Sequence, residues 1–185
     1  VLNVESFPLE LLKEVTTKCK EKKINILDVN QVKKIDIDNS KISFLNSFIP
    51  LSDDKNEHSI VTLIQYNDIN ILLMGDATVN NEDILMKRYN LPKIDILKVG
   101  HHGSRTSSSK LFIKDIEPKI SLISSGKNNK YHLPNLDVIQ RLKYYGSKVF
   151  DTQDNGELTI NLDEEVYIVY RDNLNQKSLA RESVS

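Results

Sequence analysis

The chain has few residues of the types that stabilise small folds or break regular structure. Its 185 residues include one cysteine, Cys19, no tryptophan, six glycines and five prolines. A single cysteine excludes an internal disulfide and a thiolate zinc cluster. It does not identify the compartment, because chains without disulfides occur on either side of a membrane. No apolar run approaches the roughly 18 residues that a membrane-spanning helix needs, so we expect a soluble domain, either cytoplasmic or extracytoplasmic.

The chain also lacks net charge. Its formal charge is −1 at pH 7, although 28% of its residues are charged. This balance excludes a global attraction to nucleic acid or membrane, so a polyanion would have to bind at a local site. The hydrophobic share of 39% is enough for the core of one domain. The opening residues mix charged and apolar side chains, unlike a signal peptide. Because the chain opens on Val1 rather than Met, we expect that a segment precedes it.

Hydrophobic spacing predicts alternating helices and strands. Ser6 is a candidate cap for the first helix, and Gly146 is a natural end for the last. Helices between strands indicate crossover connections and an α/β layered fold in one partial domain, residues 1–170, followed by a polar tail, 171–185. The predicted helices cover 7–22, 81–89, 108–116 and 136–145, and the predicted strands cover 24–29, 32–37, 41–45, 59–65, 69–74, 94–99, 119–124, 148–150, 157–162 and 166–170.

Two apolar strands each end in chemistry-bearing residues. The first, 69–74, runs into Gly75 and Asp76. A charge at a buried strand end has to be paired, hydrogen-bonded or bound to a cation, although a lone Gly-Asp more often caps a turn. The second strand delivers His101 and His102 between glycines. Imidazole is a common metal ligand. In extended backbone adjacent side chains diverge, so we expect one histidine to bind metal and the other to contact substrate or donate a proton. A pair of hydrogen-bonded loop histidines is about equally frequent.

Two polar loops are candidates for phosphate binding. The run 104–109 carries Ser104, Arg105 and Ser107 into a helix start, where free backbone N–H groups favour anions. The loop after the next strand carries Lys127 and His132 beside an aromatic residue. Plain N-capping of the helix is the commoner explanation for the first loop. A solvated loop is an equal alternative for the second.

Several of these motifs together resemble the metallo-β-lactamase-like domain of ComEC-type competence proteins and their stand-alone relatives. The resemblance covers nearly the whole chain except its tail, and it depends on the order and spacing of the motifs. The matching pieces are Asn56-Glu57-His58-Ser59-Ile60-Val61, Leu72-Leu73-Met74-Gly75-Asp76, Leu97-Lys98-Val99-Gly100-His101-His102-Gly103-Ser104, Ser107-Ser108, Ser124-Ser125-Gly126-Lys127-Asn128 and Asp154-Asn155-Gly156.

The resemblance implies the C-terminal part of an αββα sandwich that binds one or two divalent metals, zinc or manganese. It implies that the metal activates water against a phosphodiester or related ester, as in the degradation of DNA during uptake. By the family's pattern, Asp76 is the bridging carboxylate, His102 is a metal ligand and His101 lies nearer the leaving group. Substrate contacts would come from Ser104, Arg105, Ser107, Lys127 and His132.

The sequence departs from the family's pattern at its main ligand cluster. The His-x-Asp/His-x-Asp-His motif is absent, and His58 is a poor match for the further histidine ligand. Leu133 stands where relatives often carry a histidine, with His132 shifted by one. Because zinc sites use three or four protein ligands, we expect this chain alone to be inactive unless a missing N-terminal half or a partner chain completes it. The alternatives are an inactive module that binds phosphate or protein, and a half-domain that dimerises.

Overall fold

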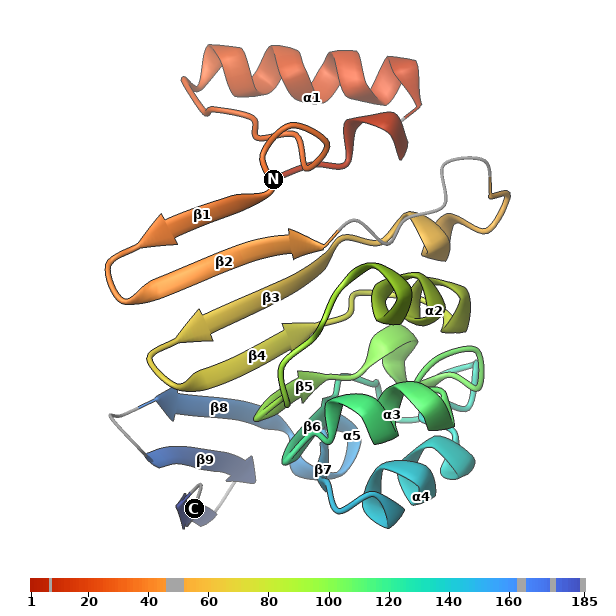
Figure 1. The fold of residues 1–185 in the computed structure, drawn as a ribbon, viewed down its shortest axis with the longest axis vertical. Coiled ribbons are helices and arrows are strands. Elements are labelled where there is room, and N and C mark those ends of the chain that lie inside the picture. The colour runs from red at the N-terminus through yellow and green to blue at the C-terminus, as the bar shows by residue number, and fades with distance from the viewer. Residues whose placement is uncertain (7, 46–51, 163–165, 174–175, 184–185) are drawn as a thin grey trace.

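The computed structural model describes residues 1–6, 8–45, 52–162, 166–173 and 176–183. A seven-stranded sheet follows chain order, β1-β2-β3-β4-β5-β6-β7, and a smaller sheet has the order β10-β9-β8 (Figure 1). The strands are β1 Lys34–Ile37, β2 Ser40–Leu45, β3 Val61–Tyr66, β4 Ile69–Leu73, β5 Ile96–Lys98, β6 Ile120–Ile123, β7 Lys148–Asp151, β8 Glu157–Leu162, β9 Val166–Asn173 and β10 Gln176–Ser183. The α-helices are α1 Leu9–Glu21, α2 Val79–Arg88, α3 Lys110–Ile116, α4 Leu136–Tyr144 and α5 Thr152–Asn155, and 3-10 turns cover η1 Val4–Ser6, η2 Lys55–His58 and η3 Gly100–Gly103.

The large sheet changes character at β4. Strands β1 to β4 are antiparallel, and two-residue turns join β1 to β2 and β3 to β4. The first residue of each turn, Asp38 and Asn67, has a positive φ, which suits tight hairpins. Strands β4 to β7 are parallel, and α2, α3 and α4 are the crossovers between them. The predicted mixed α/β fold is therefore confirmed.

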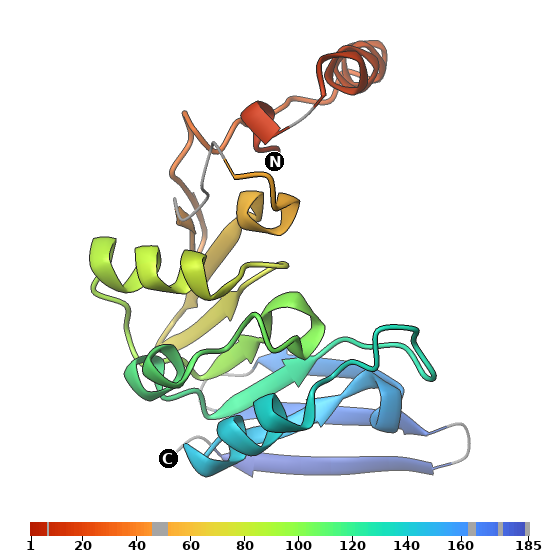
Figure 2. The same ribbon diagram turned by 90° about the vertical axis from the view of Figure 1, so that its right-hand side faces the viewer.

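The two faces of the large sheet bury different layers (Figure 2). On one face, Leu85 of α2, Phe112 of α3 and Leu142 of α4 pack with apolar strand residues, and all three are fully buried or nearly so. On the other face, the alternate side chains of β8 cover part of the sheet. This second cluster contains Ile69, Ile96, Ile120 and Phe150, with Leu158, Ile160 and Leu162 of β8 against it. The layers are thus helix, sheet and sheet.

A row of isoleucine side chains across the large sheet shows how much of this face β8 covers. The register aligns isoleucines across six strands: Ile35, Ile42, Ile64, Ile71, Ile96 and Ile120. Ile96 and Ile120 are buried, whereas the members on β1 to β4 are only half-buried. The apolar row therefore continues beyond the part of the face that β8 covers.

The N-terminal region differs most from the sequence prediction. The expected strand 24–29 is wrong: this stretch makes only an isolated bridge between Leu2 and Asp28. The helix begins at Leu9, after Pro8, and has no side-chain cap, because the Ser6 hydroxyl donates to the Asn3 carbonyl instead. Residue 7 lies outside the described residues. No residue of α1 is buried, so this helix adds little to the core.

The C-terminal residues continue as strands. Backbone of 171–173 extends β9, and 176–183 forms β10, whereas the sequence predicts a polar tail over 171–185. The boundary at residue 170 stays a prediction. No helix in the described residues is long and apolar enough to cross a bilayer.

Candidate functional site

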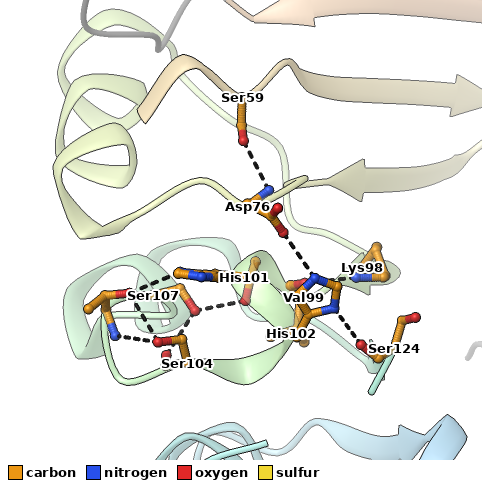
Figure 3. A network of polar contacts seen from close by, with 11 residues as sticks. Ser59, Asp76, Lys98, Val99, His101, His102, Ser104, Ser107 and Ser124 are labelled. Carbon is orange, nitrogen blue, oxygen red and sulfur yellow. Dashed lines mark hydrogen bonds and ion pairs between the residues drawn. The ribbon is translucent and has the colours of Figure 1, made fainter. Parts of the chain in front are cut away.

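The site forms where β4 and β5 end side by side. Parallel neighbours bring their carboxyl ends to the same edge of a sheet. Asp76 follows β4, and His102 follows β5 on the turn η3. Their side chains meet there, with Asp76 Oδ1 3.3 Å from His102 Nε2 (Figure 3). The structure thus brings together the two residues that the resemblance assigns to metal.

Backbone contacts lock the two strand ends together. Gly75 has a φ of +58°, and its carbonyl accepts from the His101 amide at 3.0 Å. The Asp76 amide donates to Ser59 Oγ at 3.0 Å. A Cβ at Gly75 would lie 3.3 Å from the Ser59 Cβ. Glycine therefore allows the left-handed turn and the close approach of Ser59 that orient Asp76.

The two histidines occupy strained backbone. His101 has φ 45° and ψ 45°, and His102 has φ 53° and ψ 25°. A left-handed conformation costs a non-glycine residue roughly 1–2 kcal/mol, and such strain persists where the surroundings enforce it. The extended backbone expected from the sequence is wrong. The rings still serve different partners: their centroids are 6.5 Å apart, and His101 Nδ1 lies 3.1 Å from Thr106 Oγ1.

A carbonyl fixes the tautomer of His102. Its Nδ1 lies 2.6 Å from the Ser124 carbonyl oxygen, which only accepts, so Nδ1 carries the proton. In the neutral ring, the lone pair of Nε2 then faces the Asp76 carboxylate. Two acceptors in this arrangement need a proton or a cation between them. Both side chains are about half-exposed, 47% and 45%, so a solvent ion can reach them.

Lys98 adds a positive charge that the sequence analysis did not single out. It lies on the face of β5 that carries Ile96, and its Nζ donates to the Val99 carbonyl at 3.1 Å. Burial lowers the pKa of Lys98, and the nearby Asp76 carboxylate partly offsets this effect. The sequence feature that could have identified Lys98 is its position within the largely apolar strand 94–99.

The loop 104–109 is organised differently from the predicted phosphate cradle. The Ser108 and Ser109 amides both donate to the buried Glu82 carboxylate, the latter at 2.8 Å. The buried Glu82 carboxylate thus binds the two amides that precede α3, and Ser109 Oγ accepts from the Phe112 amide at 3.3 Å. Phosphate binding at this helix start stays a prediction. Ser107 is fully buried, and its hydroxyl donates to the Gly100 and Ser104 carbonyls at 2.8 and 3.0 Å. Its hydroxyl closes the loop, and its predicted contact with substrate stays a prediction.

The other predicted substrate contacts lie on the surface around the site. Ser104 Oγ is 3.1 Å from Thr106 Oγ1, in the same small network as His101. Arg105 is exposed, and its Nε reaches Asn135 Oδ1 at 2.8 Å and Asp137 Oδ2 at 3.3 Å. Lys127 and His132 are exposed on the loop after β6. Neither is among the described contacts of Asp76 or His102, so their roles stay predictions.

In the described part of the chain, no third candidate metal ligand joins Asp76 and His102. No group of three or more His, Cys, Asp or Glu side chains gathers there in a metal-binding arrangement. His58 turns elsewhere, with Nε2 3.1 Å from the Ser52 carbonyl. Asp76 and His102 fit a divalent cation in donor type and orientation, but further ligands would have to come from another segment.

Comparison with known proteins finds no family model that matches. The chain is 41% identical to Recombination protein 2 of Haemophilus influenzae over 106 residues, which are 57% of this chain and 13% of that protein. It is 32% identical to ComE operon protein 3 of Bacillus subtilis over 145 residues, 78% of this chain and 19% of that protein. It is 34% identical to Competence protein ComA of Neisseria gonorrhoeae over 111 residues, 59% of this chain and 16% of that protein. The chain spans less than a fifth of these relatives and is homologous to the competence proteins over part of their length.

Proposed function

We propose that this chain carries part of a metal-dependent site that hydrolyses phosphodiester bonds, in a protein that acts in DNA uptake. The observation that supports it is the approach of Asp76 Oδ1 to His102 Nε2 at 3.3 Å, with the imidazole proton held on the other nitrogen by Ser124. The names of the relatives refer to recombination and competence, which favours DNA as the substrate.

Asp76 and His102 would hold a divalent metal, zinc or manganese, together with ligands from another segment or a partner chain. When bound, the metal would supply Lewis-acid activation of water and of a phosphoryl oxygen. The Ser124 carbonyl would keep His102 in its ligating tautomer, and the Ser59 hydroxyl would hold the Asp76 backbone.

The remaining residues would act on the substrate. His101 lies beside Thr106 on the outer side of the turn, where its ring can donate a proton to the leaving oxygen. Lys98 would place a positive charge close to the phosphate, next to Asp76. Ser104 and Arg105 would contact flanking phosphates.

The first test is metal stoichiometry of the longest protein that contains this chain, after incubation with zinc or manganese, measured by mass spectrometry. We expect bound metal that is lost in Asp76→Ala and retained in Asp36→Ala, a matched change at an exposed carboxylate that pairs with Lys34. The second test is cleavage of a single-stranded oligonucleotide and of bis(p-nitrophenyl) phosphate by the longest protein that contains this chain. Asp76→Ala should abolish that cleavage.

Turnover at the wild-type rate in Asp76→Ala would rule out the assigned role. A longer protein that neither binds metal nor cleaves either substrate would favour an inactive module that binds phosphate or protein. The observation that favours this inactive module is that no third candidate ligand joins Asp76 and His102 among the described residues.

A further inference from the structure

A pocket of about 400 Å³ opens beside His102. Ser124 and Gly126 line it after β6, and Tyr131 and Leu133 line it farther along the same loop. Its volume is in the range of pockets that bind small organic groups. It therefore offers space for part of a substrate directly next to the imidazole that faces Asp76.

The pocket presents an aromatic surface to solvent. Tyr131 is 68% exposed, and Leu133 beside it is half-buried. The Lys130 ammonium lies 4.8 Å from the centroid of the Tyr131 ring. An exposed, electron-rich ring next to a cation is suited to a flat heteroaromatic group that also carries negative charge.

The loop that carries Tyr131 is held in one shape. The side-chain NH₂ group of Asn129 donates to the Gly126 and Leu133 carbonyls at 2.9 and 2.6 Å. Its side-chain oxygen accepts from the Leu133 backbone amide at 3.0 Å. At its base, Ser125 Oγ donates to Asp151 Oδ1 at 2.6 Å. A preorganised pocket loses less entropy when a ligand binds. These bonds thus favour a binding role over that of a plain connecting loop.

The charge of the loop has one sign. Residues 126–135 include Lys127 and Lys130 and no acidic residue, in a chain whose net charge is −1. A local cluster of lysines beside an aromatic ring is typical of proteins that follow a nucleic-acid backbone while stacking its bases.

We propose that this pocket binds one unpaired nucleobase next to the phosphate at His102, with Tyr131 as the stacking platform. The substrate of the site is then a single-stranded nucleic acid, because the faces of a paired base are covered by its neighbours in the duplex. This inference rests on the proposed function, since it assigns the reacting phosphate to the Asp76–His102 pair.

The absence of tryptophan from the chain permits a direct test. Tyr131→Trp makes a single-tryptophan protein, and Tyr144→Trp is the matched control, since Tyr144 is 81% exposed at the end of α4. The probe is an oligothymidylate of about ten nucleotides, added with EDTA so that no cleavage occurs. We expect saturable quenching of the indole fluorescence in Tyr131→Trp and little response in Tyr144→Trp. A duplex of the same length should quench the Tyr131→Trp protein more weakly.

Two further variants test the pocket with a labelled oligothymidylate by fluorescence anisotropy. Tyr131→Ala should raise the Kd about tenfold, whereas Tyr131→Phe should keep it near the wild-type value. Gly126→Leu should also raise the Kd by narrowing the pocket. A Cβ at Gly126 meets no atom within 4 Å, so the backbone has room for a side chain at this position.

The outcomes separate this inference from the proposed function. An unquenched Tyr131→Trp protein, or equal quenching of it by single strand and duplex, overturns the base pocket even where the protein binds metal and cleaves phosphodiesters. Quenching of the Tyr131→Trp protein, in a chain that neither binds metal nor cleaves, keeps the base pocket and overturns the hydrolase.

Discussion

At Asp76, His101 and His102, the backbone determines which atoms face one another. The turn η3 holds both histidines in left-handed conformations, and the Ser124 carbonyl then selects the proton position on one ring. The two adjacent histidines therefore contact different partners. His102 turns Nε2 toward a carboxylate, while His101 turns Nδ1 toward a hydroxyl.

This arrangement predicts different metal affinities for two single variants. Loss of a residue that only orients a metal ligand costs roughly 10–100-fold in affinity. His102→Ala should weaken metal binding by more than this, because it removes a proposed ligand. His101→Ala should leave the affinity close to wild type and impair turnover. Competition with a chromophoric chelator measures both affinities, and His132→Ala is the control. Equal losses in the two variants would contradict the assignment.

Among the helices, the most consequential contact joins α2 to the start of α3. Glu82 of α2 is buried, and its carboxylate accepts from the Ser108 and Ser109 amides. Arg141 of α4 donates to the Ser108 carbonyl at 2.5 Å. Three helices thus meet at one loop, whose residue Ser108 has a φ of +56°.

We therefore expect Glu82→Gln to destabilise the protein by about 1–3 kcal/mol. The amide can accept only one of the two backbone donors, and its NH₂ group would face the other. Denaturation in urea measures the loss, and Glu10→Gln, on exposed α1, is the control. A variant that unfolds at the wild-type midpoint would show that the two backbone bonds contribute nothing net.

The same residue predicts a pH dependence. Burial raises the pKa of Glu82, and this effect exceeds the opposing hydrogen bonds from Ser109 and Ser108 and the charge of Arg141. A raised pKa in the folded state means that the folded protein holds the proton more tightly, so the unfolding free energy falls as pH rises from the ordinary value through the raised one. The stability advantage of wild type over Glu82→Gln should shrink across that window. An advantage that grows with pH would mean that the hydrogen bonds prevail over burial.

The parallel half of the fold could be predicted from the sequence, and the N-terminal part could not. Apolar strands that alternate with capped helices located β4 to β7 to within a few residues, because periodicity and turn residues agree there. The stretch 24–29 has strand-like composition, yet no neighbouring strand among the described residues pairs with it beyond the bridge at Asp28. Strand formation depends on a partner, which local composition does not report.

The candidate site was predictable in part for a similar reason. Asp76 and His102 each follow an apolar strand, and adjacent parallel strands bring such residues together. The Glu82 contact was hidden, because 26 residues separate it from Ser108 and its neighbours suggest an ordinary helix surface. The sequence analysis weighed an anion site against plain N-capping at this helix start, and neither alternative included Glu82.

At the scale of the whole molecule, the isoleucine row lies on a sheet face that β8 covers only in part. Ile96 and Ile120 lie under β8, whereas Ile35, Ile42 and Ile64 are only half-buried on the continuing face. Contiguous apolar surface of this kind marks contact with another protein surface. A second copy of the chain, or a partner segment with an apolar sheet face, would complete the layer.

We expect the purified chain to associate through this face as its concentration rises. Ile64→Lys should shift the protein toward monomer, because a charge in the centre of the row cannot be buried without cost. Leu111→Lys, at a leucine that is 68% exposed on α3, should leave association unchanged. Size-exclusion chromatography with light scattering measures both. A wild-type chain that stays monomeric at every concentration would exclude pairing of this face with a second copy.

The paired left-handed histidines also imply a trade-off between folding stability and the proposed activity. Each holds the chain in a conformation that glycine would adopt without strain, so the sequence is less stable at these two positions than it has to be. Replacing either with glycine would relax the turn and, in the same step, remove an imidazole. Screening this chain for thermal tolerance alone would therefore favour variants that have lost one of the histidines of the proposed site. At this turn, a higher melting temperature would not indicate a better protein.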